Sequence, residues 1–115
     1  MEPSERKTEE FEQALARARA AKVTLKLFIA GMGARSTRAV VDGKRLRDAL
    51  GERCSLEIID IYEHPEAAAE AQIVAVPTLV REQPLPRRKL IGAIGDVTRV
   101  LRSLKLLPLP AAGAG

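Results

Sequence analysis

The stretch VTLKLFIAGMG, residues 23–33, decides the fold class. Its apolar side chains recur at every second position, which is typical of a β-strand with one face on a core. They are Val23, Leu25, Leu27 and Ile29. Two glycines then break the pattern and predict a turn. We therefore expect a strand over residues 23–29.

The segment after this turn has helical periodicity. Ser36 suits the N-cap and Gly51 the C′ position of a helix between them. The apolar face of that helix comprises Val40, Gly43, Leu46 and Leu50. The nearly continuous apolar run at residues 56–61 then predicts a strand that is covered on both faces.

The next segment predicts a short helix and a hairpin. Pro65 is favoured in the first turn of a helix, which residues 67–71 would continue. Residues 78–82 and 89–91 flank a turn that contains two prolines, which indicates a β-hairpin.

Asp96 is a good N-cap for a last helix, whose apolar stripe comprises Val97, Val100, Leu101, Leu104 and Leu107. The expected order is strand, helix, strand, helix, strand, strand, helix. In an α/β protein this is the thioredoxin-like plan βαβ(α)ββα, and the handedness of crossovers leaves few other topologies.

The length of 115 residues favours one domain, which we place at residues 22–107. Before it, residues 1–21 predict a helical extension with Phe11, Leu15 and Ala18 at helical spacing. After it, residues 108–115 are expected to form a flexible tail.

The composition is that of a globular protein, with 46% hydrophobic and 30% charged residues and a net charge of +4. This mild basic balance fits nucleic acid, an anionic membrane or an acidic protein equally well. One cysteine excludes an intrachain disulfide and suits a reducing compartment. The charged start is unlike a signal peptide, and no apolar run reaches the roughly 20 residues of a membrane span. We expect a cytoplasmic protein that does not contact membranes.

No catalytic constellation is visible in the sequence. Thioredoxin-like oxidoreductases need a reactive thiol at the start of the first domain helix, but residues 31–38 contain no cysteine. Cys54 lies elsewhere and fits the role of a small buried side chain. His64 and Asp60 lack neighbouring ligands or bases in the sequence. We expect no enzyme activity, no metal and no cofactor.

A basic run at Arg81, Arg87, Arg88 and Lys89 leaves two interpretations open. It could contact phosphates, or it could be a solvated basic face. The aromatic residues are not interleaved with these charges to stack on bases. Nucleic-acid binding is therefore the less favoured alternative.

Three blocks of sequence resemble the KaiB family of circadian-clock proteins, over residues 23–107. They are LKLFIAG at 25–31, IDI at 59–61 with Pro65 and IVAVPTL at 73–79, and PLPRRKLIG at 84–92. The blocks lie on the family pattern without a gap between them.

The resemblance implies a non-enzymatic regulator that binds the hexameric ATPase KaiC, with KaiA and output histidine kinases as further partners. It places Arg38, Arg81 and Arg88 on the partner-facing side, and arginine suits bidentate contacts to carboxylates. It also implies that Pro77 is a structural cis-proline. An adaptor for a histidine kinase or a stress-response partner is the alternative within the family.

The family also implies two folds: the thioredoxin-like state and a ground state with a rearranged C-terminal half, often within a tetramer. A dimer or tetramer of this chain is therefore a further expectation. Ser103 and Lys105 replace a glycine and an aspartate that are common in the family's last helix. Both changes favour that helix. We therefore expect the thioredoxin-like fold, with a hairpin at 78–82 and 89–92 and a helix over 97–106.

Overall fold

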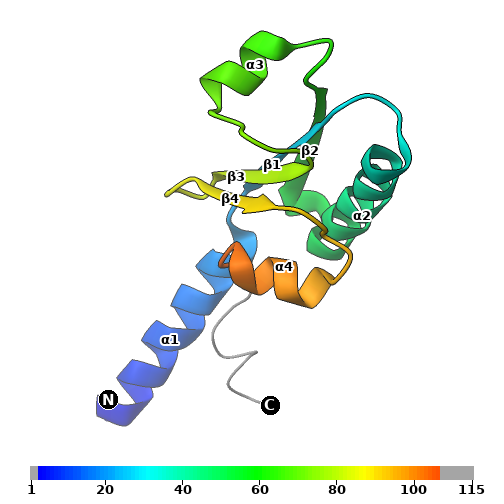
Figure 1. The fold of residues 1–115 in the computed structure, drawn as a ribbon. Coiled ribbons are helices and arrows are strands. Elements are labelled where there is room, and N and C mark those ends of the chain that lie inside the picture. Colours follow the sequence, from blue (N-terminus) through cyan, green and yellow to red (C-terminus); the bar gives the residue numbers. More distant parts are fainter. Residues whose placement is uncertain (1–2, 107–115) are drawn as a thin grey trace.

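The computed structural model describes residues 3–106 and contains one mixed four-stranded sheet in the order β2-β1-β3-β4 (Figure 1). β1 (Val23–Ile29) and β2 (Cys54–Asp60) are parallel. β3 (Thr78–Gln83) is antiparallel to β1 and forms a hairpin with β4 (Arg88–Ile91). The predicted thioredoxin-like α/β plan is confirmed.

Helices lie on both faces of the sheet (Figure 1). α2 (Ala34–Leu50) and α4 (Val97–Ser103) pack on one face, and α3 (Pro65–Glu70) lies on the other. A 3-10 turn, η1 (Gly51–Arg53), joins α2 to β2. α1 (Pro3–Ala20) precedes the sheet and projects away from it.

The period-two pattern of β1 divides its side chains between two apolar clusters. Val23, Leu25, Leu27 and Ile29 are buried with residues of α2 and α4. Phe28 is 1% exposed and packs in a smaller cluster beneath α3. β1 is therefore buried on both sides, as its position inside the sheet requires.

Two local expectations need correction. β2 is an edge strand that is covered only in part: Cys54 and Leu56 pack in the cluster on one face and Ile59 in the cluster on the other, but Ser55, Glu57 and Ile58 are exposed. Ser36 is not the N-cap of α2, because the helix already begins after Gly33. The apolar periodicity located the helix correctly. Its first residue was misplaced because the residues before Ser36 include two glycines and an alanine and no polar N-cap side chain.

The C-terminal half follows the prediction closely. The hairpin pairs Leu79 with Leu90 and Arg81 with Arg88. Asp96 caps α4, because its Oδ1 accepts a hydrogen bond from the backbone N–H of Arg99 at 3.1 Å. α4 ends at Ser103, three residues earlier than expected. The predicted contribution of Leu107 to its stripe and the tail at 108–115 lie outside the described residues.

Candidate protein-docking site

A hollow of about 390 Å³ lies at the carboxyl end of β1, where the chain turns into α2. Its lining residues come from α2, from the loop before β3 and from the loop before α4: Ala34, Arg35, Arg38, Ala39, Asp42, Pro77, Ala93, Ile94 and Gly95. In thiol oxidoreductases of this plan a helix N-terminus at this edge activates the reactive cysteine. In this chain, the first turns of α2 contain alanine, arginine, serine and threonine in place of cysteine.

Two polar side chains hold the turn after β1, which leads into α2. Ser36 Oγ donates to the carbonyl oxygen of Ala30 at 3.0 Å and accepts from the Ala30 N–H at 3.3 Å, which ties the start of α2 to the end of β1. Asp60 Oδ1 accepts from the N–H groups of Gly31, at 3.1 Å, and Tyr62, at 2.9 Å. The lone carboxylate at Asp60 therefore connects the turns after β1 and β2.

Gly31 is required where these two turns meet. Its φ of 69° lies in the left-handed region, and a Cβ there would stand 3.3 Å from the ring of Tyr62. The glycine lets the Tyr62 ring cover the turn while 75% of that residue stays exposed.

The exposed surface beside the hollow is apolar and basic. Arg38 has an 81% exposed side chain whose Nε lies 3.6 Å from Oδ2 of Asp42, a carboxylate that is nearly buried. A second shallow depression continues along α2 from the hollow and includes Met32, Val41 and Arg45. We call the exposed residues Met32, Arg35, Arg38, Val41 and Arg45 the docking face. Of these, the sequence had identified Arg38.

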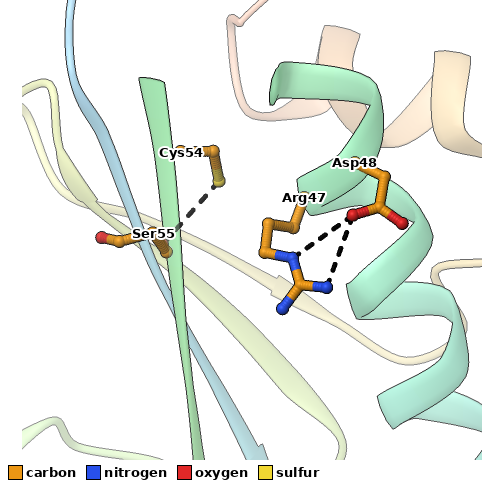
Figure 2. Close-up of polar contacts among 4 residues, drawn as sticks. All are labelled: Arg47, Asp48, Cys54 and Ser55. Atoms are coloured by element: carbon orange, nitrogen blue, oxygen red, sulfur yellow. Dashed lines mark hydrogen bonds and ion pairs between the residues drawn. The ribbon is translucent and has the colours of Figure 1, made fainter. Parts of the chain in front are cut away.

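Cys54 lies far from this edge. It is the first residue of β2 and pairs with Val23 at the start of β1, whereas the hollow is at the other end of the strands. Figure 2 shows its Sγ directed at the carbonyl oxygen of Ser55, at 3.7 Å, with Arg47 turned toward Asp48 on α2. Burial raises the pKa of the Cys54 thiol, although the charges of Arg47 and Arg53 oppose this.

Arg81 requires a correction, because it is not on the surface in this fold. It is 3% exposed, and its guanidinium donates to the carbonyl oxygens of Leu104 and Pro86. Burial lowers its pKa, and the like charge of Arg88 across the hairpin adds to this, but an arginine stays charged at neutral pH. Arg81 therefore links β3 to the end of α4 and to the hairpin turn. It cannot meet a partner without leaving these contacts.

The other residues of the basic run make different contacts. Arg87 Nε lies 3.0 Å from Glu82 Oε2, and Lys89 Nζ donates to the carbonyl oxygen of Gln72 at 2.9 Å. Arg88 is exposed. In the sheet, Arg88 lies opposite Arg81, and Arg81 lies opposite Leu25 near the start of β1. Arg38 lies in α2, close to the end of β1. Arg88 and Arg38 are therefore toward opposite ends of the sheet.

The remaining predicted residues have structural positions. The Val76–Pro77 peptide bond is cis, and Pro77 lines the hollow. His64 precedes α3, with Nδ1 3.4 Å from Glu66 Oε1.

In the described part of the chain no three histidine, cysteine or carboxylate side chains are grouped to hold a metal ion. No helix within residues 3–106 is long and apolar enough to cross a membrane.

Ser103 and Lys105 lie at the end of α4. Ser103 is its last residue, and Lys105 follows the helix with a φ of 57°. The N–H of Lys105 donates to the carbonyl oxygen of Arg102, and that of Leu106 to Leu101, which is a Schellman motif. Lys105 therefore occupies the left-handed C′ position, where glycine is preferred, and the expected gain from placing a lysine there is offset.

The chain is similar to known proteins over most of its length. Residues 26–106 match the family model described as the KaiB domain. The chain is 34% identical to the circadian clock protein KaiB3 of Synechocystis sp. over 88 residues, which cover 76% of this chain and 86% of that protein. It is 41% identical to the circadian clock oscillator protein KaiB of Prochlorococcus marinus over 87 residues, which cover 72% and 71%.

Solved structures confirm the fold. The N-terminal domain of Synechococcus elongatus SasA aligns with a TM-score of 0.61 and 24% identity, over 76% of this chain and 88% of that one. Mitochondrial thioredoxin 3 of Saccharomyces cerevisiae also aligns with a TM-score of 0.61, at 20% identity, over 84% and 89%. At these identities the likeness concerns the thioredoxin-like fold alone.

Proposed function

The chain belongs to the KaiB family of circadian-clock proteins, and on that premise we propose that it is a non-enzymatic regulator that docks on a hexameric ATPase of the KaiC type. Docking would modulate the phosphorylation and ATPase cycle of that partner or its signalling output. A KaiA-like protein or a histidine kinase would be a further partner.

The observation that carries the proposal is the docking face at the edge where thiol enzymes of this plan place their cysteines. Met32 is 86% and Val41 50% exposed, which is unusual for large apolar side chains, and exposed apolar groups that lie together mark interaction sites. Arg38 beside them offers a guanidinium fork for carboxylates of a partner. Arg88 is a second contact candidate toward the opposite end of the sheet. Arg81 supports the fold from inside.

The absence of a thiol reaction is part of the proposal. Cys54 is buried, its raised pKa keeps the thiol protonated at neutral pH, and it lies at the far end of β2 from the hollow. Insulin reduction with dithiothreitol should therefore proceed at the rate of the dithiothreitol blank. Cys54→Ser should leave that rate unchanged, and an activity lost with this substitution would contradict the proposal.

The direct test uses the KaiC-family ATPase of the same organism, with binding measured by titration in ATP and in ADP. Arg38→Glu should weaken binding at least tenfold, because an attraction becomes a repulsion at a charged interface. Lys44→Glu is the matched control, since it makes the same charge change at an exposed position of α2 outside the docking face. Equal effects of the two substitutions, or no binding by the unaltered chain, would overturn the proposal.

A pull-down from native lysate, with and without ATP, distinguishes the two alternative functions, which are a histidine-kinase adaptor and a nucleic-acid-binding domain. Recovery of a histidine kinase in place of the ATPase would favour the adaptor role. Recovery of nucleic acid that is lost at moderate salt would favour a basic nucleic-acid-binding domain.

A further inference from the structure

The stripe of α2 that faces the sheet contains an aspartate. Asp42 is only 5% exposed, and its neighbours on the stripe, Ala39 and Leu46, are buried too. An apolar side chain is expected at such a position, because burying a carboxylate costs free energy unless the charge is paired. Aspartate is also a poor residue for the middle of a helix, since its side chain competes for backbone hydrogen bonds. Asp42 breaks two local rules, and such departures are expected at functional positions.

The Asp42 carboxylate makes one polar contact within residues 3–106. Its Oδ2 lies 3.6 Å from Nε of Arg38, one turn earlier on α2. The loop before α4 lies against the same oxygen, because a Cβ added to Gly95 would stand 3.5 Å from it, an ordinary contact distance. The aspartate lines the hollow and also the depression that continues along α2. Asp42 therefore lies beneath the docking face.

The stability of α2 does not explain this ion pair. A helix gains most when the acidic residue precedes the basic one by four positions, whereas here Arg38 precedes Asp42. The Arg38 side chain is 81% exposed, so water and salt screen its charge, and an isolated pair of this kind contributes little to folding. The contact therefore has more effect on the orientation of Arg38 than on the stability of the helix.

The contact at Nε leaves the end of the Arg38 side chain free. A guanidinium has five N–H donors, of which four are on the terminal nitrogens Nη1 and Nη2. Neither of these nitrogens has a polar partner in the described part of the chain. Together they form a fork that fits both oxygens of a carboxylate. An exposed arginine loses rotamer freedom when it binds, and a side chain already held at Nε has less of it to lose.

We propose that Asp42 is a positioning residue of the docking face, which holds the guanidinium of Arg38 in place for a carboxylate of the partner. The inference rests on the proposed function and adds to it a residue that does not itself touch the partner. It predicts the opposite of a simple charge effect. If net charge alone mattered, removing the negative charge of Asp42 would tighten binding to an acidic surface, whereas loss of positioning weakens it.

The first test is a double-mutant cycle on the full chain, with binding to the KaiC-family ATPase of the same organism measured by titration. Asp42→Asn keeps the shape of the side chain and should weaken binding about three- to tenfold, within the range for coupled neighbours. In an Arg38→Ala background, the same substitution should change the affinity less than about twofold. Asp48→Asn is the matched control, since Asp48 is exposed near the end of α2 and outside the docking face, and it should leave the affinity unchanged.

The second test needs no partner. NMR relaxation of the Arg38 Nε–H group in the free chain should give a higher order parameter than that of Arg45. Arg45 is an exposed arginine of the same helix and has no polar contact within residues 3–106. Asp42→Asn should remove the difference between the two arginines, because it removes the charge that holds Nε.

Several results would overturn the proposal. They are an Arg38 Nε–H group as mobile as that of Arg45, tighter or unchanged binding in Asp42→Asn, and an equal loss of affinity with and without Arg38. The last of these would show that Asp42 supports the fold and not the arginine. A chain that does not bind the ATPase would contradict the proposed function, and the relaxation measurement would still decide whether Asp42 positions Arg38.

Discussion

The two halves of the domain are held together by different means. From β1 to β2, α2 begins and ends at glycines, and its buried side chains face an apolar sheet. From α3 to α4, two helices end at residues other than glycine in the left-handed region, Gln72 with a φ of 56° and Lys105 with a φ of 57°. Such residues cost roughly 1 kcal/mol or more each, and surrounding contacts must hold them.

The surrounding contacts in the C-terminal half are polar links over long sequence distances. Arg81 connects β3 to the carbonyl oxygen of Leu104 at the end of α4, and Lys89 connects β4 to that of Gln72 after α3. A cation at a helix C-terminus is favourable, and a hydrogen bond to a charged donor is stronger than one between neutral groups. The comparison teaches that α2 in the N-terminal half is bounded by glycines, whereas the helix ends of the C-terminal half are held by polar links from β3 and β4.

The largest expected effect is that of removing Arg81. Arg81→Met keeps much of the volume and leaves the buried carbonyl oxygen of Leu104 and the partly buried one of Pro86 without their donor. A buried polar group that loses its partner costs about 1–3 kcal/mol, and less where water can reach it. We expect the free energy of unfolding to fall by about 2–4 kcal/mol in urea denaturation. Arg88→Met, at the exposed position opposite in the hairpin, should change it by less than about 0.5 kcal/mol. Similar losses of unfolding free energy in Arg81→Met and Arg88→Met would show that the contacts of Arg81 do not stabilise the C-terminal half.

Asp60 tests the N-terminal half at the polar junction between the turns after β1 and β2. Asp60→Ala removes the acceptor of the Gly31 and Tyr62 N–H groups. Because both bonds lie near the surface, where water can replace the carboxylate, we expect a loss of about 1–2 kcal/mol in thermal or urea unfolding. Partner binding should weaken as well, since the turn that carries Met32 loses its support. A loss as large as that of Arg81→Met would show that the N-terminal half also depends on a single polar link.

The smallest effect concerns Lys105. Lys105→Gly should raise the free energy of unfolding by about 0.5 kcal/mol, because glycine adopts the left-handed conformation without the steric cost. Lys44→Gly, at an exposed position inside α2, should instead lower it by about 1 kcal/mol. Loss of stability in both variants would mean that Lys105 is not held in the left-handed region.

The sequence predicted the architecture better than it predicted the roles of charged residues. Periodicity, prolines and Asp96 located the strands of the sheet and the helices packed on it, because these signals are local. The burial of Arg81 could not be predicted, since it depends on the end of α4, which is 23 residues away along the chain. The edge position of β2 was also not predicted, because a short apolar run does not distinguish an edge strand from a central one. In the docking face, Arg38 was found through the family resemblance, whereas Met32 and Val41 became visible only through their exposure.

The most direct test of the difference between the halves is residue-resolved hydrogen exchange of the Arg81→Met variant against the unaltered chain. We predict that protection falls in β4 and α4 while the amides of α2 and of the β1–β2 ladder keep theirs, because the C-terminal half opens as a separate unit of lower stability. An equal fall in protection across α2, β1, β2 and α4 would contradict the account, since the domain would then open as one unit and Arg81 would not support one half more than the other.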